Sequence, residues 1–385
     1  MNENLAITKL RLSNYRNHKF LQIIPKKNII LISGKNGSGK TNILESISLF
    51  DSPNGFRNAN LSEIINYDLT GPLELFGVNI KASIDNKFEQ LGLGLRKKSN
   101  ILEKIISFNK QKNKNSDIKN LINIFWVLPK MSHLFQDSPV ERRNFLDSMI
   151  SNTDQFYKKK LSEYKKYKYE RLKILKQKNI MQNDEWLNIV EKKMSEVGIV
   201  ICDSRRVFLN TLNKSFYKID NQIPSLYLKL NGLIDKALEE KTALYTEEFI
   251  LEMLKSNRVK DSISGRTNFG IDKTDLLVFD KYTKKEAKNF STGEQKIIIM
   301  SIIFSYLKIL EKIKAHKILF LLDDIFSYLD LRFIKNIIFK LNELKFQTWI
   351  TDVQGENVNE IKEFSSIIHN INIDDKMFKL VNNKV

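Results

Sequence analysis

The sequence has little cysteine and no long apolar run. Cys202 is the single cysteine among 385 residues, which excludes a disulfide framework and indicates a reducing compartment. The longest apolar runs, such as 297–303, are far shorter than the roughly 18–20 residues that a membrane-spanning helix needs. The first residues also lack the basic-then-apolar plan of a secretory signal. We therefore expect a cytoplasmic protein.

Repeats and zinc ligands are missing as well. The four histidines, His18, His133, His316 and His369, are scattered and have no cysteine partners, so no zinc site is predicted. There is no internal repeat and no sustained heptad pattern, which argues against a long coiled coil. A chain of this length suits two or three domains.

Basic residues outnumber acidic ones, 63 to 45, giving a net charge of +18. Such a surplus favours a polyanionic partner such as nucleic acid or an anionic membrane. The chain is also rich in Lys, Ile and Asn, which AT-rich codons raise together. Charge alone therefore leaves a nucleic-acid partner and compositional bias as alternatives, and the motifs must decide.

A glycine-rich loop is the most specific motif. It fits G-x-x-x-x-G-K-[ST] at Gly34, Lys35, Asn36, Gly37, Ser38, Gly39, Lys40 and Thr41. The β-branched run 28–33 predicts a buried strand before it, and the apolar spacing in 42–50 predicts a helix after it. In this context the loop amides and the helix N-terminus bind phosphates. We predict that Lys40 reaches the β- and γ-phosphates of ATP and that Thr41 holds Mg²⁺.

A second motif lies near the other end of the sequence. In the segment 317–322 an apolar run follows Lys317 and ends in Asp323 and Asp324, which is typical of a buried parallel strand that delivers acids to a phosphate site. Asp323 is predicted to bind Mg²⁺ directly or through water, and Asp324 to accept a proton from the attacking water. A core strand that ends in a solvated turn is the alternative.

A capped helix is predicted between these two motifs. Ser291 is a good N-cap, Glu294 is its capping-box partner, and an apolar run follows. A Ser-x-Gly turn at a positive helix end can also sense phosphate. After the acidic pair come the residues 327–330 and the strand-like run 348–352.

In this order the motifs resemble an ABC-type ATPase head of the SMC/Rad50 kind, which implies an α/β fold of the P-loop NTPase class. The resemblance makes Asp323 the Walker B acid and Asp324 the catalytic base. It makes Arg16 and Asn17 nucleotide contacts. The remaining implied sites are a signature motif that acts on the partner subunit's nucleotide (Ser291, Thr292, Gly293, Glu294 and Gln295) and a D-loop (Ser327, Leu329 and Asp330).

Finer matches, at residues 52–57, 139–147 and 264–267, resemble the RecF family along nearly the whole chain. Transporter ATPases place the signature much closer to the glycine loop, and SMC and Rad50 proteins insert a long coiled coil. Three features depart from expectation. Residues 270–275 lack the proline, histidine and arginine of the family pattern, Gln136 is a weak candidate for a Q-loop, and Asp352 stands where many ABC ATPases carry histidine.

The middle of the chain is predicted to be helical. We expect an ATPase head at residues 1–140 and 265–385, with an α-helical lobe inserted at 141–264. The segment Lys158–Lys178 carries ten basic residues, and 186–216 has similar periodicity. A lysine-rich face with interleaved tyrosines is expected to contact a phosphate backbone and stack on bases; a solvated charged face is the alternative. The basic stretch 96–119 is expected to form a hairpin.

The resemblance implies an ATP-dependent DNA clamp that forms a homodimer on ATP at single-strand gaps or at junctions of single- and double-stranded DNA. Its implied partners are RecO and RecR, and its implied roles are recombinational repair, replication restart and SOS induction, with weak DNA-stimulated ATP hydrolysis. Two alternatives remain. One is a DNA-binding scaffold with a residual nucleotide site and no useful hydrolysis; the other, a transporter-associated ATPase, is disfavoured by the signature spacing.

Overall fold

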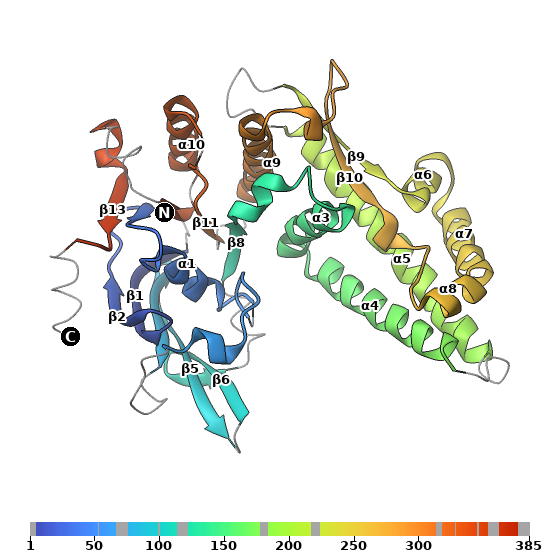
Figure 1. Ribbon diagram of the computed structural model, residues 1–385, viewed down its shortest axis with the longest axis horizontal. Helices are drawn as coiled ribbons and strands as arrows, with labels where there is room; N and C mark the ends of the chain where they lie inside the picture. Colours follow the sequence, from blue (N-terminus) through green and yellow to red (C-terminus); the bar gives the residue numbers. More distant parts are fainter. Residues whose placement is uncertain are drawn as a thin grey trace. The chain divides into compact units, whose positions relative to one another are not determined.

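The chain forms two compact units, residues 1–131 with 310–385 and residues 132–309, in the computed structural model (Figure 1). Both units contain helices and strands, so the predicted α/β class is confirmed. The residues that the structure describes are 5–52, 54–66, 76–98, 101–113, 122–177, 184–216, 224–312, 318–327, 329–344, 346–352 and 362–375.

A five-stranded parallel sheet forms the centre of the first unit, with the order β13-β3-β12-β11-β8. Its strands are β3 (Ile29–Ser33), β8 (Asn123–Val127), β11 (Ile318–Leu322), β12 (Gln347–Asp352) and β13 (Ile368–Asn372). Every residue of β3, β11 and β12 is buried, as expected for parallel strands covered on both faces. The predicted strands at 28–33, 317–322 and 348–352 are thus confirmed, although residue 317 lies outside the described part.

The register of this sheet brings the motifs to one edge. β12 lies between β3 and β11, with Asp352 paired to Ser33 and Ile350 paired to Leu322. Because all three strands are parallel, the loops that follow them leave the sheet on the same side. The glycine loop, the acidic pair and Asp352 therefore emerge as neighbours.

A six-stranded antiparallel sheet completes the first unit, with the order β2-β1-β4-β5-β6-β7. Its strands are β1 (Ala6–Tyr15), β2 (His18–Ile23), β4 (Gly77–Ile84), β5 (Lys87–Lys98), β6 (Ile101–Phe108) and β7 (Gln111–Asn113). The pairing of β5 with β6 confirms the hairpin expected after residue 96, while residues 99–100 and 114–119 of that stretch lie outside the described part. The buried Gln347 amide joins the two sheets through bonds of 2.8 and 3.0 Å to Ile7 N and O.

Two helices flank the motifs of the first unit. They are α1 (Lys40–Ser48), which starts inside the glycine loop, and α10 (Leu331–Glu343). Short 3₁₀ turns cover Leu61–Ile64 and Lys362–Ser366. The helix predicted at 42–50 is therefore confirmed as α1, shifted by two residues toward the loop.

The second unit is mainly helical. Its helices are α3 (Pro139–Thr153), α4 (Gln155–Leu175), α5 (Asp184–Lys214), α6 (Leu233–Glu240), α7 (Ala243–Ser256), α8 (Arg258–Ser264) and α9 (Thr292–Lys312), whose residues up to Ile309 belong to this unit. Short 3₁₀ turns cover Ile271–Lys273, Ala287–Asn289 and Pro129–His133, of which only the residues from Ser132 belong to this unit. The helices expected at 158–178 and 186–216 are α4 and α5, although Lys178 lies outside the described residues.

The prediction of a purely helical segment at 141–264 is wrong in one place. β9 (Leu226–Asn231) lies within it and pairs with β10 (Asp275–Asp280). Leu226, Leu228 and Leu230 are buried and alternate with exposed residues, a two-residue period that indicates a strand. The compact unit is also wider than the predicted lobe, because β10 belongs with β9. The division into 1–140, 141–264 and 265–385 stays a prediction.

The marker at 139–147 is a set of structural anchors. Arg142 donates to both carboxylate oxygens of Asp275 at 2.8 and 2.9 Å, and Arg143 donates to Thr274 O at 2.7 Å. Asp147 accepts from the Arg205 guanidinium at 2.9 and 2.8 Å. These bonds tie α3 to β10 and to α5, so this motif specifies packing within the second unit.

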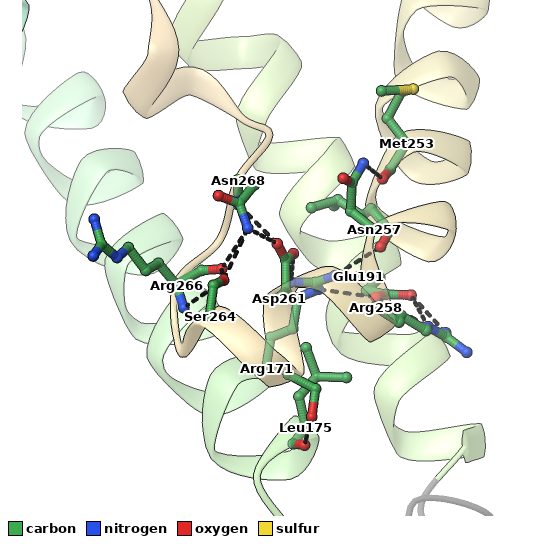
Figure 2. A network of polar contacts seen from close by, with 12 residues as sticks. Arg171, Leu175, Glu191, Met253, Asn257, Arg258, Asp261, Ser264, Arg266 and Asn268 are labelled. Carbon is green, nitrogen blue, oxygen red and sulfur yellow. Dashed lines mark hydrogen bonds and ion pairs between the residues drawn. The ribbon is translucent and has the colours of Figure 1, made fainter.

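A buried ionic network joins α4, α5 and α8 (Figure 2). Arg171 is fully buried and donates to Glu191 at 2.9 Å and to Asp261 at 2.6 Å. Arg258 also binds Glu191, at 2.6 Å. Asp261 in turn accepts from the backbone and the side chain of Asn268 at 2.9 and 2.8 Å. Each buried charge therefore has an ionic partner, which a buried ion requires.

No helix within the described residues is sufficiently long and apolar to cross a bilayer.

Candidate nucleotide-binding site

The glycine loop joins the end of β3 to the start of α1. Gly39 caps α1 with φ of 101°, a conformation that favours glycine. A Cβ atom at this position would lie 2.5 Å from both Asn17 Oδ1 and His18 Nε2. The turn between β1 and β2 thus presses against the loop, and no larger residue fits at position 39.

Lys40 lies over the loop that precedes it. Its ammonium donates to the carbonyls of Gly34 and Lys35 at 2.6 and 2.8 Å. Burial lowers the pKa of Lys40, while the carboxylates around it raise it: Asp324, Asp374, Asp352 and Asp323. A cation is therefore held at the mouth of a loop whose amides and helix end favour anions.

Asp323 accepts hydrogen bonds from two hydroxyl groups, one on α1 and one on β12. Thr41 Oγ1 donates to Asp323 Oδ1 at 2.8 Å, and Thr351 Oγ1 donates to the same oxygen at 2.7 Å. Burial raises the pKa of Asp323, and the bonds from Thr351 and Thr41 lower it. The structure thus brings together Thr41 and Asp323, which stand far apart in the sequence.

This pair fits a magnesium ion. Hydroxyl and carboxylate oxygens are hard ligands, and Mg²⁺ usually takes one or two such groups together with water and substrate phosphates. Within the described residues there is no cluster of three or more His, Cys, Asp or Glu side chains able to hold a metal. Thr41 and Asp323 would therefore hold the ion jointly with a bound triphosphate.

Asp324 is fixed in an uncommon conformation. Its φ is 47°, in the left-handed region that Asp tolerates better than most residues. Its amide donates to Thr351 Oγ1 at 3.0 Å, and its carboxylate accepts from Ser327 Oγ at 2.5 Å. The predicted base and the first predicted D-loop residue are thus in contact.

The remaining D-loop residues have structural contacts of their own. Leu329 is buried. Asp330 caps α10 by accepting from Phe333 N at 3.0 Å. Residue 328 lies outside the described part.

Arg16 and Asn17 lie in the turn between β1 and β2. Asn17 Nδ2 donates to Ser38 O in the glycine loop at 3.0 Å. Arg16 instead forms a bidentate pair with Glu45 of α1, at 2.5 and 2.6 Å, and Tyr15 donates to the same buried carboxylate at 3.1 Å. Asn17 thus touches the loop, while Arg16 secures α1; nucleotide contact by either stays a prediction.

Three residues of the site were not predicted. Thr351 bridges both acids, and Asp374 accepts from Lys35 N at 2.5 Å. The positive charge of Arg57 lowers the pKa of Asp323, and the Arg57 guanidinium donates to Asn42 Oδ1 at 2.8 Å. Thr351 could have been found as a hydroxyl at the end of a predicted strand, and Arg57 stands in a marker; Asp374 carries no such signal.

The predicted signature motif lies in the second unit, where it starts α9. Ser291 N and Oγ donate to Glu294 Oε2 at 2.8 and 2.7 Å, and Glu294 N donates to Ser291 Oγ at 3.3 Å. The predicted capping box is thus confirmed, and these bonds lower the pKa of Glu294. Gln295 is buried and donates to the carbonyls of Lys288 and Phe290 at 3.1 and 2.7 Å.

The exposed part of the signature has open space around it. Ser291 and Thr292 are exposed, and a Cβ atom on Gly293 would meet no atom within 4 Å. Packing within the described chain therefore does not require glycine at 293.

The two residues suggested for other ABC motifs have clear positions. Gln136 donates to Lys288 O at 2.8 Å, so it braces the turn that leads to the signature. Asp352 is buried at the end of β12 and is one of the carboxylates that raise the pKa of Lys40. Their roles toward nucleotide stay predictions.

Comparison with known proteins adds a family context. Residues 6–374 match the family described as RecF/RecN/SMC N terminal domain. The chain is similar to the DNA replication and repair protein RecF of Rickettsia felis, with 32% identity over 369 residues, 95% of this chain and 98% of the relative. The RecF protein of Rickettsia prowazekii is 32% identical over 368 residues, 95% of this chain and 99% of the relative.

Solved structures agree with this similarity. The recombination mediator protein RecF in the RecFOR pathway, solved with ATP, has a TM-score of 0.77 and 25% identity, covering 96% of this chain and 98% of that chain. The Smc head domain of Pyrococcus furiosus bound to the C-terminal domain of ScpA has a TM-score of 0.55 and 16% identity, covering 99% of each chain. The second likeness shows the fold alone, that of an ABC-type ATPase head.

Proposed function

This chain belongs to the RecF family, and from that premise we propose that it is an ATP-dependent DNA-binding clamp that acts in DNA repair and replication in the cytoplasm. The contact between Thr41 and Asp323, at 2.8 Å, is the observation that carries the proposal. It joins the hydroxyl at the start of α1 to the acid at the end of β11, the two protein groups that a magnesium triphosphate site uses.

The triphosphate lies along the glycine loop and the N-terminus of α1, with Lys40 on its β- and γ-phosphates. Thr41 and Asp323 would hold Mg²⁺, which would neutralise phosphate charge. Asp324 orients and deprotonates the attacking water, because its carboxylate is held by Ser327 and its backbone by Thr351. Hydrolysis is weak and is stimulated by DNA.

ATP drives the formation of a homodimer. In it, Ser291–Gln295 of one subunit cover the nucleotide held by the other. The exposed Ser291 and Thr292 and the open space beside Gly293 support this role, because a glycine that the chain does not need for its own packing leaves room for another group. The helix end of α9 adds its partial positive charge.

DNA is bound at single-strand gaps or at junctions between single- and double-stranded DNA, with RecO and RecR as partners, in recombinational repair, replication restart and SOS induction. The similar RecF structures are those of a recombination mediator in the RecFOR pathway, which supports the pathway, and the net charge of +18 supports DNA as the partner.

Sedimentation of the wild type and of Ser291→Arg with Mg-ATP, with and without DNA, tests the proposal. We expect dimers of the wild type and only monomers of the variant, which still binds ATP because its own glycine loop is intact. An ATP-dependent dimer of Ser291→Arg would contradict the action of the signature on the partner's nucleotide.

A DNA-binding scaffold without useful hydrolysis is the second candidate. The departure of residues 270–275 from the family pattern favours it. Measured ATP turnover with and without DNA separates the two, because the scaffold shows none above background under either condition.

A further inference from the structure

Seven basic residues of the segment 158–178 fall into two groups, while Lys158 is half-buried and Lys165 is exposed about 100° around the helix from Lys166. Arg171 is fully buried in the network of Figure 2. Lys160 is paired with Glu163 at 2.9 Å, and Lys168 is paired with Asp272. These three cations form ion pairs with carboxylates of the same unit.

The second group forms one exposed row. It consists of Lys159, Lys166, Lys173 and Lys176, all exposed, with Tyr169 among them, and we name it the α4 row. Lys159, Lys166 and Lys173 are seven residues apart, which places them on one side of a helix at a rise of about 10.5 Å per step. From Lys159 to Lys176 the row is about 25 Å long.

Two carboxylates of α4, Glu163 and Glu170, lie within one turn of the row, and each has a hydrogen-bond partner outside it. Glu163 is bound to Lys160, and Glu170 accepts from the indole of Trp186 at 3.2 Å. No carboxylate among the described residues pairs with any of the four lysines of the row. The charge of Lys159 lowers the pKa of Glu163, but the row has more cations than neighbouring carboxylates. Such a line of positive charge fits a linear polyanion better than a compact acidic ligand.

Tyr169 gives the row a second property. Its side chain is 73% exposed in the middle of the line, between Lys166 and Lys173, so it contributes little to packing of the unit. An exposed aromatic ring between phosphate-binding cations is the arrangement that stacks on an unpaired base. A duplex buries its base faces, and a membrane-binding helix would need an apolar face, whereas Tyr169 is the single aromatic residue in the row.

The C-terminal end of the row is extended by the marker at 264–267. Lys176 lies beside Gly265, its Cε 3.6 Å from the position of a Cβ atom there, and Ser262 Oγ donates to Leu175 O at 2.8 Å. Figure 2 shows the Arg266 guanidinium directed away from the ionic network. No carboxylate in the described part of the chain pairs with Arg266, so a free guanidinium stands close to the end of the row.

We propose that the α4 row, continued by Arg266, binds one strand of single-stranded DNA, with the lysines on phosphates and Tyr169 stacked on a base. This inference rests on the proposed function, since it takes DNA as the partner, and it adds the surface and the form of DNA bound. The network around Asp261 holds the loop with Arg266 in place.

Salt-dependent binding of a labelled oligothymidine and of a duplex of the same length, both with Mg-ATP, tests this surface. One variant carries Lys159→Gln, Lys166→Gln, Lys173→Gln and Lys176→Gln. The matched control loses the same charge from exposed lysines on other elements: Lys192→Gln, Lys236→Gln, Lys241→Gln and Lys255→Gln. We expect the slope of log affinity against log salt to fall by about 2.8 for the row variant, about 0.7 per phosphate contact on a single strand, and to change little for the control.

A second variant isolates stacking. Tyr169→Ala should weaken oligothymidine binding by about 5- to 100-fold without a change in salt slope, and Tyr169→Phe should restore it; duplex binding should change in neither variant. An unaltered slope in the row variant, an equal loss in the control, or an effect confined to anionic phosphatidylserine vesicles would each overturn the proposal. A wild type that dimerises on ATP but binds no DNA would instead refute the proposed function.

Discussion

Two clusters of charge in this chain are built on opposite plans. In the network of Arg171, Glu191 and Asp261, guanidinium groups offset the buried carboxylates. In the first unit, Asp323 is held by the neutral hydroxyls of Thr41 and Thr351, although Lys40 lies in the same site. The first cluster is complete within the fold, whereas the second keeps an anion and a cation apart for use by a ligand.

The difference teaches how charge is divided between stability and chemistry. Removing a member of a closed buried pair leaves an uncompensated ion and costs stability. Removing a charge from a ligand-binding site affects binding and catalysis, while the free energy of unfolding changes little. Substitutions in each cluster should therefore change different measurable quantities.

The largest effect is expected in the closed network. Arg171→Met leaves Asp261 without its guanidinium and should lower the free energy of unfolding by about 3–5 kcal/mol, measured by urea denaturation with circular dichroism. Lys193→Met, which breaks the exposed pair with Glu196, should cost no more than about 1 kcal/mol. Similar losses in both variants would contradict the contrast.

Asp324→Asn addresses the open site. Asn keeps an acceptor for Ser327 but cannot take a proton from water, so ATP turnover should fall at least about 100-fold, measured as phosphate release with DNA present. The ATP-bound dimer should persist or last longer. Turnover equal to the wild type would remove Asp324 from the role of base.

Lys40→Ala should weaken ATP binding by about 10- to 100-fold, the equivalent of about 1.5–3 kcal/mol for a hydrogen bond to a charged group. Its urea midpoint should stay near that of the wild type, because among the described residues Lys40 donates to carbonyls of its own loop. Equilibrium binding of a fluorescent ATP analogue gives the readout, and unchanged affinity would count against the assignment of the loop.

The smallest change in stability is expected at Asp235, a carboxylate that is buried in the fold but bound to a neutral hydroxyl. It is buried, accepts from Thr274 Oγ1 at 2.6 Å and has a raised pKa because of burial. Below the unfolded pKa, near 3.9, both states hold the proton and the burial has no ionic cost. Above it the unfolded chain ionises first, so the destabilisation grows with pH and is complete once the pH has passed the folded pKa. Asp235→Asn should therefore gain stability relative to the wild type as pH rises above about 4, as followed by urea unfolding; a difference independent of pH would contradict this.

The sequence was sufficient for the parts of the site that are local. The loop at 34–41 and the pair at 323–324 each lie beside their own buried strand, so a short window contains both the chemistry and the context. Thr351 and Asp374 reach the site only through the order of β3 among the other strands, which local patterns do not encode. Arg16 could not be assigned to Glu45 from sequence for the same reason.

The lysines of α4 show a further limit. Composition identified a basic helix, but the choice between a solvated face and a binding face depends on which lysines are already paired. Lys160 and Lys168 have carboxylate partners, and the one bound to Lys168 stands at residue 272, far away in sequence. β9 was missed for a different reason, since its alternating leucines lie in a region dominated by helical periodicity.

The position of β3 in the parallel sheet has a consequence for biosynthesis. β3 is made early, yet its two neighbours, β12 and β13, come from residues 347–372. A ribosome that adds about 5–20 residues per second exposes β3 for many seconds before either partner strand exists. The antiparallel sheet, whose strands all precede residue 114, can pair in that interval, so the nascent chain acquires its scaffold first and its nucleotide site last.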